Sequence, residues 1–254
     1  MDIYDLDIDG VGLATVADSF AAVERRVCAE RKLDWERLAE VLRSDFAGAE
    51  DIRLMLRNIP RFGAGGSSGD FWAARIADTY VHLVTDRPTP AGYRVVPTLF
   101  SHGSNIDVGK ALGATPNGRK AGTLVSHGPN PDPGFMPNGA SALTAKASAV
   151  ARVQPGYGNP GPLQLEVDRA LLTQESGVEA LMSLIRTHHD MGGTLINVNV
   201  ISREQILEAH RDPEKFPDLL VRVTGFSAYW RSLSPEYRQQ VVDRFLASAP
   251  PRGA

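Results

Sequence analysis

A single glycine interrupts a strand-like run near the C-terminus, and this position restricts the fold more than any other. Residues 219–223 read Leu-Leu-Val-Arg-Val, a pattern typical of a β-strand. Gly225 then stands where the pattern predicts another packed side chain, and Phe-Ser-Ala-Tyr-Trp follows at 226–230. A glycine inside a strand pattern marks a bulge or a close approach of backbone. Because the aromatic stretch is too apolar for a solvent turn, we expect Gly225 to be buried.

Strand-like and helical segments are interspersed along the chain, which favours an α/β fold with a parallel component. Residues 93–101 and 195–201 have the β-branched composition of strands. Apolar residues at helical spacing, together with caps such as Asp34, predict helices. The expected helices lie near residues 13–30, 34–42, 49–58, 70–85, 140–153 and 177–191, with two more after Ser202 and Ser234. The first dozen residues look irregular, and the glycine- and serine-rich residues 63–69 look like a flexible linker.

Composition limits where the protein works and what it binds. The 254 residues allow one large domain or two small ones. With 27 basic and 30 acidic residues the net charge is −3, which gives no basic footprint for nucleic acid or an anionic membrane. No apolar run approaches a membrane span, and the acidic start is unlike a signal peptide. One cysteine excludes an intrachain disulfide. We therefore expect a cytoplasmic protein.

Five segments follow one another in an order and spacing that resemble a known family. They are Gly12–Ser19, Gly113–Gly122, Asn197–Ser202, Asp212–Leu219 and Leu220–Trp230. Together they are similar to the C-terminal part of the glycyl radical enzymes, the superfamily of pyruvate formate-lyase and the diol dehydratases. The likeness covers nearly the whole chain. It implies half of that family's ten-stranded α/β barrel over residues 1–125, followed by a glycyl radical domain over residues 126–254.

By this resemblance Gly225 is the residue that carries the radical. An α-carbon without a side chain can flatten between two peptide groups, which delocalise an unpaired electron. Burial would then keep oxygen and water away. The resemblance implies a protein-derived radical installed by a radical S-adenosylmethionine activase, with no dissociable cofactor. The expected surroundings of the radical loop are Arg222, Phe226, Ser227, Tyr229 and Trp230. Their aromatic members either form walls of the site or belong to ordinary core.

The strand at 93–101 supplies the only hints about the substrate. It resembles the pocket-lining strand of the dehydratase and eliminase branch, and its Phe-Ser ending is closer to that branch than to the formate-lyase branch. The candidate pocket residues are Arg94, Thr98, Phe100, Ser101 and His102. The resemblance therefore implies a lyase or dehydratase that removes water or another leaving group from a small polar molecule.

The family also requires a cysteine whose thiyl radical attacks the substrate. Cys28 lies inside a predicted helix, without the glycine-flanked loop of the reactive cysteine, so we interpret it as a helical side chain of ordinary reactivity. In family order the cysteine loop precedes Gly12–Ser19. We therefore expect a separate cysteine-bearing subunit, in an anaerobic and oxygen-sensitive heteromer. A cut between half-barrels would expose strand edges, and we expect an interface of about 2,000 Å² or more.

Other interpretations of the same resemblance stay open. The chain could be a repair subunit that replaces an oxygen-damaged radical domain. It could act in a formate-lyase-type acyltransferase or a decarboxylase, or be a catalytically silent interaction protein.

Two polar patterns have less specific meanings. His188 and His189 point about 100° apart on a helix and have no second pair at ligand spacing, so we expect no metal site. Asn197 and Asn199 share one face of a strand, with aliphatic residues on the other. They either line a polar interior or bond to neighbouring backbone.

Overall fold

The computed structural model describes residues 5–86, 89, 92–101, 103–132, 142–154, 161–173 and 175–248. Its helices are α1 (Leu13–Val23), α2 (Trp35–Arg43), α3 (Glu50–Arg57), α4 (Ser68–Thr85), α5 (Ser104–Ala111), α6 (Ala142–Arg152), α7 (Glu175–Asp190), α8 (Arg203–Arg211) and α9 (Pro235–Ser248). Its strands are β1 (Asp5–Asp9), β2 (Arg94–Thr98), β3 (Leu163–Asp168), β4 (Ile196–Ile201), β5 (Leu220–Arg222) and β6 (Ser227–Tyr229). A π-helical turn, Glu24–Ala29, extends α1, and short 3-10 turns occur at Arg169–Thr173, Pro213–Lys215 and Trp230–Ser232. All the predicted helices and the three predicted strands, at 93–101, 195–201 and 219–223, are present.

The described strands pair in twos. β1 and β2 are parallel, with Asp5 beside Arg94 and Asp9 beside Thr98, and β3 and β4 are also parallel. β5 and β6 form an antiparallel hairpin. The parallel component expected from the sequence is confirmed, whereas a half-barrel stays a prediction. The first dozen residues were predicted to be irregular, and this prediction is wrong over 5–9, which form a strand. In this segment acidic residues alternate with Leu6 and Ile8 at the period of a strand.

The glycine-rich segment 63–69 is an ordered helix start, so its prediction as a flexible linker is wrong. Ser67 caps α4 by accepting from the Asp70 amide at 3.0 Å, and Asp70 in turn accepts from the Ser67 amide at 2.9 Å. This reciprocal capping box satisfies two backbone donors at the helix end. Gly69 itself is buried and forms the second residue of the helix. Composition alone does not register these specific bonds.

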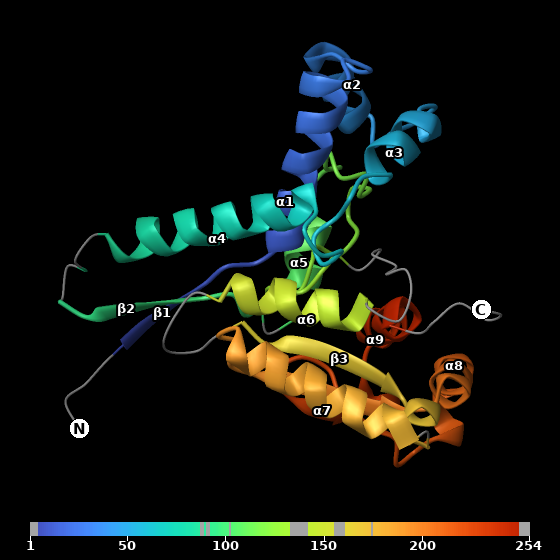
Figure 1. Cartoon of the computed structure of the whole chain (residues 1–254). Coiled ribbons are helices and arrows are strands. Elements are labelled where there is room, and N and C mark those ends of the chain that lie inside the picture. The colour runs from blue at the N-terminus through green and yellow to red at the C-terminus, as the bar shows by residue number, and fades with distance from the viewer. Residues whose placement is uncertain are drawn as a thin grey trace.

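The apolar core is divided among four clusters that follow the arrangement in Figure 1. One cluster joins α1, α2 and α3, and a second joins α1 and α4 with Leu99 and Ala149. A third lies where α6 and α7 run alongside β3. The fourth is built only from residues between Ile201 and Phe245, including Trp230. The C-terminal part that contains Gly225 therefore has a hydrophobic core of its own.

Candidate functional site

Gly225 lies in the turn of the β5–β6 hairpin. Antiparallel pairing of the two strands ends at Arg222 and Ser227, and the Val223 amide closes the turn by donating to the Phe226 carbonyl at 3.0 Å. The interruption that the sequence shows at this position is therefore a reversal of the chain. Strand pairing before and after the glycine holds both ends of the turn.

One side of Gly225 lies against the ring of Phe100. A β-carbon built on Gly225 would stand 2.4 Å from Cζ and 3.1 Å from Cε1 of that ring. Phe100 is only 5% exposed, so its ring has little room to retreat. Gly225 is not among the residues with a positive φ. Close approach, and not backbone conformation, is thus what excludes a side chain at this position.

The prediction that Gly225 is buried is wrong for this chain. Gly225, Phe226 and Ser227 are exposed, while Val223 and Thr224 just before them are fully buried. The buried half of the turn faces β4 and α9, whereas the half that follows stays exposed although Phe100 contacts Gly225 and Tyr237 contacts Phe226. Apolar character in the sequence could not distinguish residues buried within the chain from residues left on its surface. The described part of the chain does not shield Gly225 from oxygen and water.

The aromatic residues after Gly225 separate into core and surface. Trp230 is fully buried, and its indole N–H donates to the Ala209 carbonyl at 2.8 Å. It therefore belongs to the core. Tyr229 is 54% exposed, and Phe226 meets the Tyr237 ring of α9 edge to face, with ring centroids 6.4 Å apart. The exposed rings of Phe226 and Tyr229 follow Gly225 closely in the chain, so they are available to form a wall of the radical site.

The Arg222 side chain, from β5 of the hairpin, bonds to both β4 and β6. Its Nε donates to Asn197 Oδ1 at 3.0 Å and its Nη1 to Ser227 Oγ at 3.4 Å. Asn197 and Asn199 are 5% and 6% exposed, and both bond to the backbone of the chain leading to Gly225. Of the two roles that the sequence left open, bonding to neighbouring backbone is confirmed.

Glu166 and Arg244 form a buried ion pair under the hairpin that the sequence did not reveal. Arg244 Nε lies 2.8 Å from Glu166 Oε1, and the two side chains are 9% and 0% exposed. Lys146 is buried nearby and donates to the Gln164 carbonyl at 2.5 Å. Burial lowers the pKa of Lys146 to about 8, partly opposed by Glu166 and reinforced by Arg244. A charged residue alternating with aliphatic ones in 163–167 is the signal that could have indicated this site.

The candidate pocket residues other than Phe100 have different surroundings. Arg94 is exposed and donates to Asp5 on β1. Thr98 is buried and bonds through its hydroxyl to Asp9. Ser101 is 1% exposed, and its hydroxyl has no partner among the described residues. His102 lies outside the described residues.

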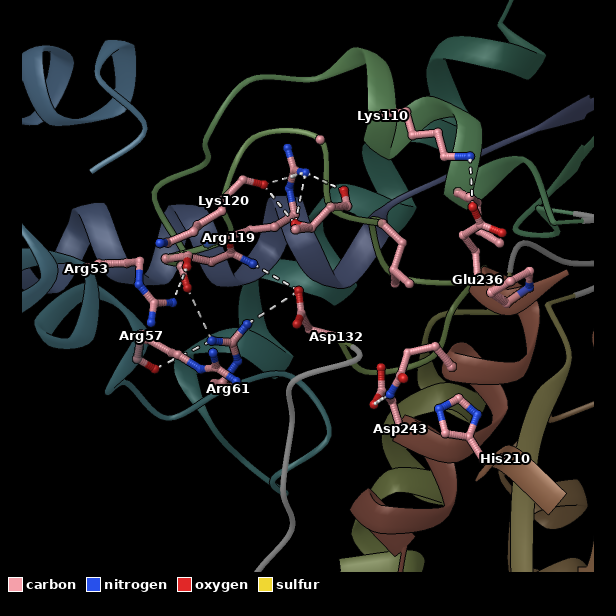
Figure 2. Close-up of a pocket in the computed structure, with 18 residues that line it drawn as sticks. Arg53, Arg57, Arg61, Lys110, Arg119, Lys120, Asp132, His210, Glu236 and Asp243 are labelled. Carbon is pink, nitrogen blue, oxygen red and sulfur yellow. Dashed lines mark hydrogen bonds and ion pairs between the residues drawn. The ribbon is translucent and has the colours of Figure 1, made fainter. Parts of the chain in front are cut away.

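A separate cavity of about 840 Å³ opens between α3, the loop at 117–124 and α9 (Figure 2). Its cationic lining consists of Arg53, Arg57, Arg61, Lys110, Arg119 and Lys120. Glu236 and Asp243 of α9 also line it, and Lys110 Nζ lies 3.8 Å from Glu236 Oε1. Most of the cations already bond within the chain, as the dashed lines in Figure 2 show. Gly225 is not among the described lining residues, so the cavity is distinct from the candidate radical site.

A buried cluster of charges joins α1 to the wall of this cavity. Asp18 is fully buried; it accepts from the Phe62 amide at 2.8 Å and lies 3.0 Å from Arg61 Nε. Arg61 also lies 3.5 Å from Asp132, which in turn accepts from Asn117. Asn117 belongs to a tight turn in which the Gly118 amide donates to the Thr115 carbonyl at 3.0 Å. Burial raises the pKa of Asp18 to about 7, although Arg61 opposes the shift.

The raised pKa predicts a pH-dependent stability that an Asp18→Asn variant lacks. The folded chain binds a proton at Asp18 below about pH 7, whereas the unfolded chain binds it only below about pH 4. The Asp18 contribution to the free energy of unfolding therefore falls as pH rises from about 4 to about 7, and it is constant above. Urea unfolding between pH 5 and 8 would show wild type losing stability relative to Asp18→Asn. Asp51→Asn, at an exposed position, controls for the lost charge. A constant difference across this range would contradict the prediction.

Cys28 and the histidine pair lie on helical segments with different exposure. Cys28 is exposed in the π-helical turn after α1. His188 is buried with Nδ1 2.9 Å from the Ala147 carbonyl, and burial lowers its pKa. Among the described residues, no group of three or more histidine, cysteine, aspartate or glutamate side chains could hold a metal ion. Within the same residues, no helix is long and apolar enough to cross a membrane.

Two family models match consecutive parts of the chain. A pyruvate formate lyase-like model matches residues 2–109, and a glycine radical model matches residues 125–231, the part that contains Gly225. This combination of a pyruvate formate lyase-like part and a glycine radical part defines the class of the glycyl radical enzymes. The chain belongs to the glycyl radical enzyme family.

Curated relatives and solved structures agree with this assignment. The chain is 31% identical to trans-4-hydroxy-L-proline dehydratase from Clostridioides difficile and 32% identical to isethionate sulfite-lyase from Oleidesulfovibrio alaskensis, with 93% and 92% of the chain covered. The B12-independent glycerol dehydratase of Clostridium butyricum matches 96% of the chain at 30% identity and a TM-score of 0.84. The chain spans only about 30% of the length of these relatives, with 30%, 28% and 31% covered.

Proposed function

We propose that this chain is the radical-bearing subunit of a two-chain glycyl radical lyase or dehydratase, with Gly225 as the radical residue. The carrying observation is the position of Gly225 within the segment matched by the glycine radical model. Phe100 lies against one side of Gly225, and the residue as a whole is exposed. A partner can therefore reach this carbon without any rearrangement of the hairpin.

The proposed chemistry moves one hydrogen atom at a time. A carbon radical that the activase generates from S-adenosylmethionine takes one hydrogen atom from the Gly225 α-carbon. In turnover, Gly225 takes a hydrogen atom from a cysteine thiol of the partner, and the resulting thiyl takes one from a substrate C–H bond. The substrate radical then loses water or another leaving group. The two transfers run in reverse and restore the thiol and the Gly225 radical.

The contribution of this chain is to place Gly225 and to exclude water once the complex is formed. We assign Phe100 and Ser101 to the pocket, because Phe100 touches Gly225 and the buried Ser101 hydroxyl has no described partner. Arg94 and Thr98 bond to β1, so their part in the pocket is indirect. The division into a half-barrel over 1–125 and a radical domain over 126–254 stays part of the proposal.

Exposed apolar surface supports a partner chain that covers Gly225. Phe226 and Tyr229 are 41% and 54% exposed beside it. On β4, Val198 and Val200 are 37% and 45% exposed on the face opposite the asparagines. Apolar strand faces of this kind mark interaction surfaces.

Anaerobic purification followed by electron spin resonance tests the proposal. The tagged chain should retain a cysteine-bearing protein, and activation of this complex should give a doublet from the one hydrogen left on a glycine α-carbon. Absence of an organic radical from every activated complex would overturn the proposal. If the chain instead restored activity to an oxygen-damaged, full-length relative without forming a complex of its own, the repair function would replace it.

A further inference from the structure

The paired strands β3 and β4 have one polar face that is buried. Gln164 lies beside Asn197, and Glu166 beside Asn199, in the parallel register. These four side chains are between 1% and 6% exposed. The opposite face of β3 packs its aliphatic side chains against α6 and α7. A buried polar face is costly unless it is hydrogen-bonded, so its partners indicate its purpose.

The asparagines of this face bond to the chain that leads into Gly225. Asn199 accepts from the Arg222 amide at 2.7 Å and donates to the Arg222 carbonyl at 2.8 Å, as a neighbouring strand would. Asn197 donates to the Thr224 carbonyl at 3.0 Å. Because β4 and β5 do not belong to one sheet, these side-chain amides take the place of a backbone ladder.

Arg244 completes the set from α9. Its Nη1 donates to the Val223 carbonyl at 2.6 Å, and its Nη2 to the Arg222 carbonyl at 3.1 Å. Glu166 holds the guanidinium in place through Nε. Each of the three peptide carbonyls before Gly225 thus accepts from a side chain of β4 or α9. The last of these, the Thr224 carbonyl, belongs to the peptide group that contains the Gly225 nitrogen and is bonded to the Gly225 α-carbon.

We propose that Asn197, Asn199 and Arg244 are positioning residues that fix the peptide units leading to Gly225. The radical part of this inference rests on the proposed function. The C-terminal part has its own apolar core between Ile201 and Phe245, which supplies stability besides these bonds. Their directional geometry sets where the chain before Gly225 lies, as second-layer contacts do in preorganised sites. By donating to the Thr224 carbonyl, Asn197 also polarises a peptide group over which the unpaired electron spreads.

Residue-resolved amide hydrogen exchange on the full chain tests the positioning without any radical. In Asn199→Ala the Arg222 amide should exchange about 10-fold faster, because both hydrogen bonds between Asn199 and the Arg222 backbone are lost. Amides in α8 and α9 should keep their wild-type rates. Asn199→Gln keeps an amide that can both accept and donate, so its acceleration should be smaller. Asn58→Ala replaces an exposed asparagine and should leave the rate at Arg222 unchanged.

Two exchange results would overturn the inference. One is an unchanged rate at Arg222 in both Asn199 variants. The other is an equal acceleration throughout 201–246, which would show that the asparagine stabilises the whole part instead of positioning one segment. If Asn199→Ala does not fold, Asn199→Gln is judged by the same comparison.

Electron spin resonance of the activated complex supplies the second measurement. Asn197→Ala should lower the radical yield about 5-fold and change the hydrogen splitting of the doublet, with kcat falling more than KM changes. Normal yield, splitting and kcat in Asn197→Ala would overturn the radical part. If wild type itself gives no radical, the proposed function fails, and the exchange rates still decide whether the side chains position this segment.

Discussion

Replacing Gly225 with alanine is expected to abolish both the radical doublet and all turnover of the activated complex. A glycine that has lost one α-hydrogen keeps the other, and coupling to that hydrogen gives the doublet. Alanine would keep none, so a doublet could not arise from position 225. Its methyl group would also stand 2.4 Å from Phe100 Cζ, well inside van der Waals contact. The variant therefore removes the chemistry and disturbs the packing together.

A second substitution separates these two effects. Phe100→Leu shortens the side chain that the new methyl group would meet, so Gly225→Ala should cost less stability in that background. The doublet should still be absent from the double variant. Gly113→Ala is the matched control, because Gly113 has open space around its α-carbon and no left-handed φ, and it should keep full signal. A wild-type doublet in the Gly225→Ala complex would contradict the assignment of the radical residue.

Local signals in the sequence predicted the helices well. Asp34 accepts from the Arg37 amide at 2.7 Å, and Ser202 from the Gln205 amide at 3.1 Å, as expected for helix caps. Caps and apolar periodicity depend on residues within one or two turns of each other. They can therefore be interpreted without any knowledge of the remaining chain.

Two of the strands that the sequence did not predict, β1 and β3, have partners that are distant in the chain. In β3, Gln164 and Glu166 interrupt the aliphatic run, and their burial depends on α9 and β4. The strand β1 is defined by its pairing with β2, which lies more than eighty residues later in the chain. Both segments alternate at a period of two. Their alternating polar residues are charged or amide side chains, and the sequence does not show which residues they would pair with.

The candidate site shows the same division. The resemblance selected Gly225 and Phe100, and these two residues are in close contact. It did not indicate Glu166 or Arg244, because their role depends on where α9 crosses the end of the hairpin. The exposure of Gly225 was mispredicted for a related reason. Apolar neighbours in sequence show that a surface will be covered, but they do not show whether this chain or another one covers it.

The largest expected effect on stability comes from Gly69→Ala. The new β-carbon would stand 2.1 Å from the Phe62 nitrogen, 2.5 Å from the Arg61 carbonyl carbon and 2.7 Å from Asp18 Oδ1. Two of these atoms belong to the backbone, so no rotation of a side chain relieves the overlap. The Phe62 amide also donates to Asp18, and this buried bond would be pushed apart. We expect a loss of about 3 kcal/mol or more in the free energy of unfolding.

Two other glycines in the chain make this prediction specific. Gly66, in the same glycine-rich segment, has open space but a φ of +70°, so Gly66→Ala should cost about 1 kcal/mol of backbone strain. Gly113→Ala meets neither a close atom nor a left-handed φ and should be neutral within about 0.5 kcal/mol. Urea unfolding should show the largest loss in the free energy of unfolding for Gly69→Ala, a smaller loss for Gly66→Ala and the smallest for Gly113→Ala. If 63–69 were a flexible linker, Gly69→Ala would be as harmless as Gly113→Ala. Equal unfolding midpoints for these two variants would therefore support the linker interpretation. They would contradict the close packing of α4 against Phe62.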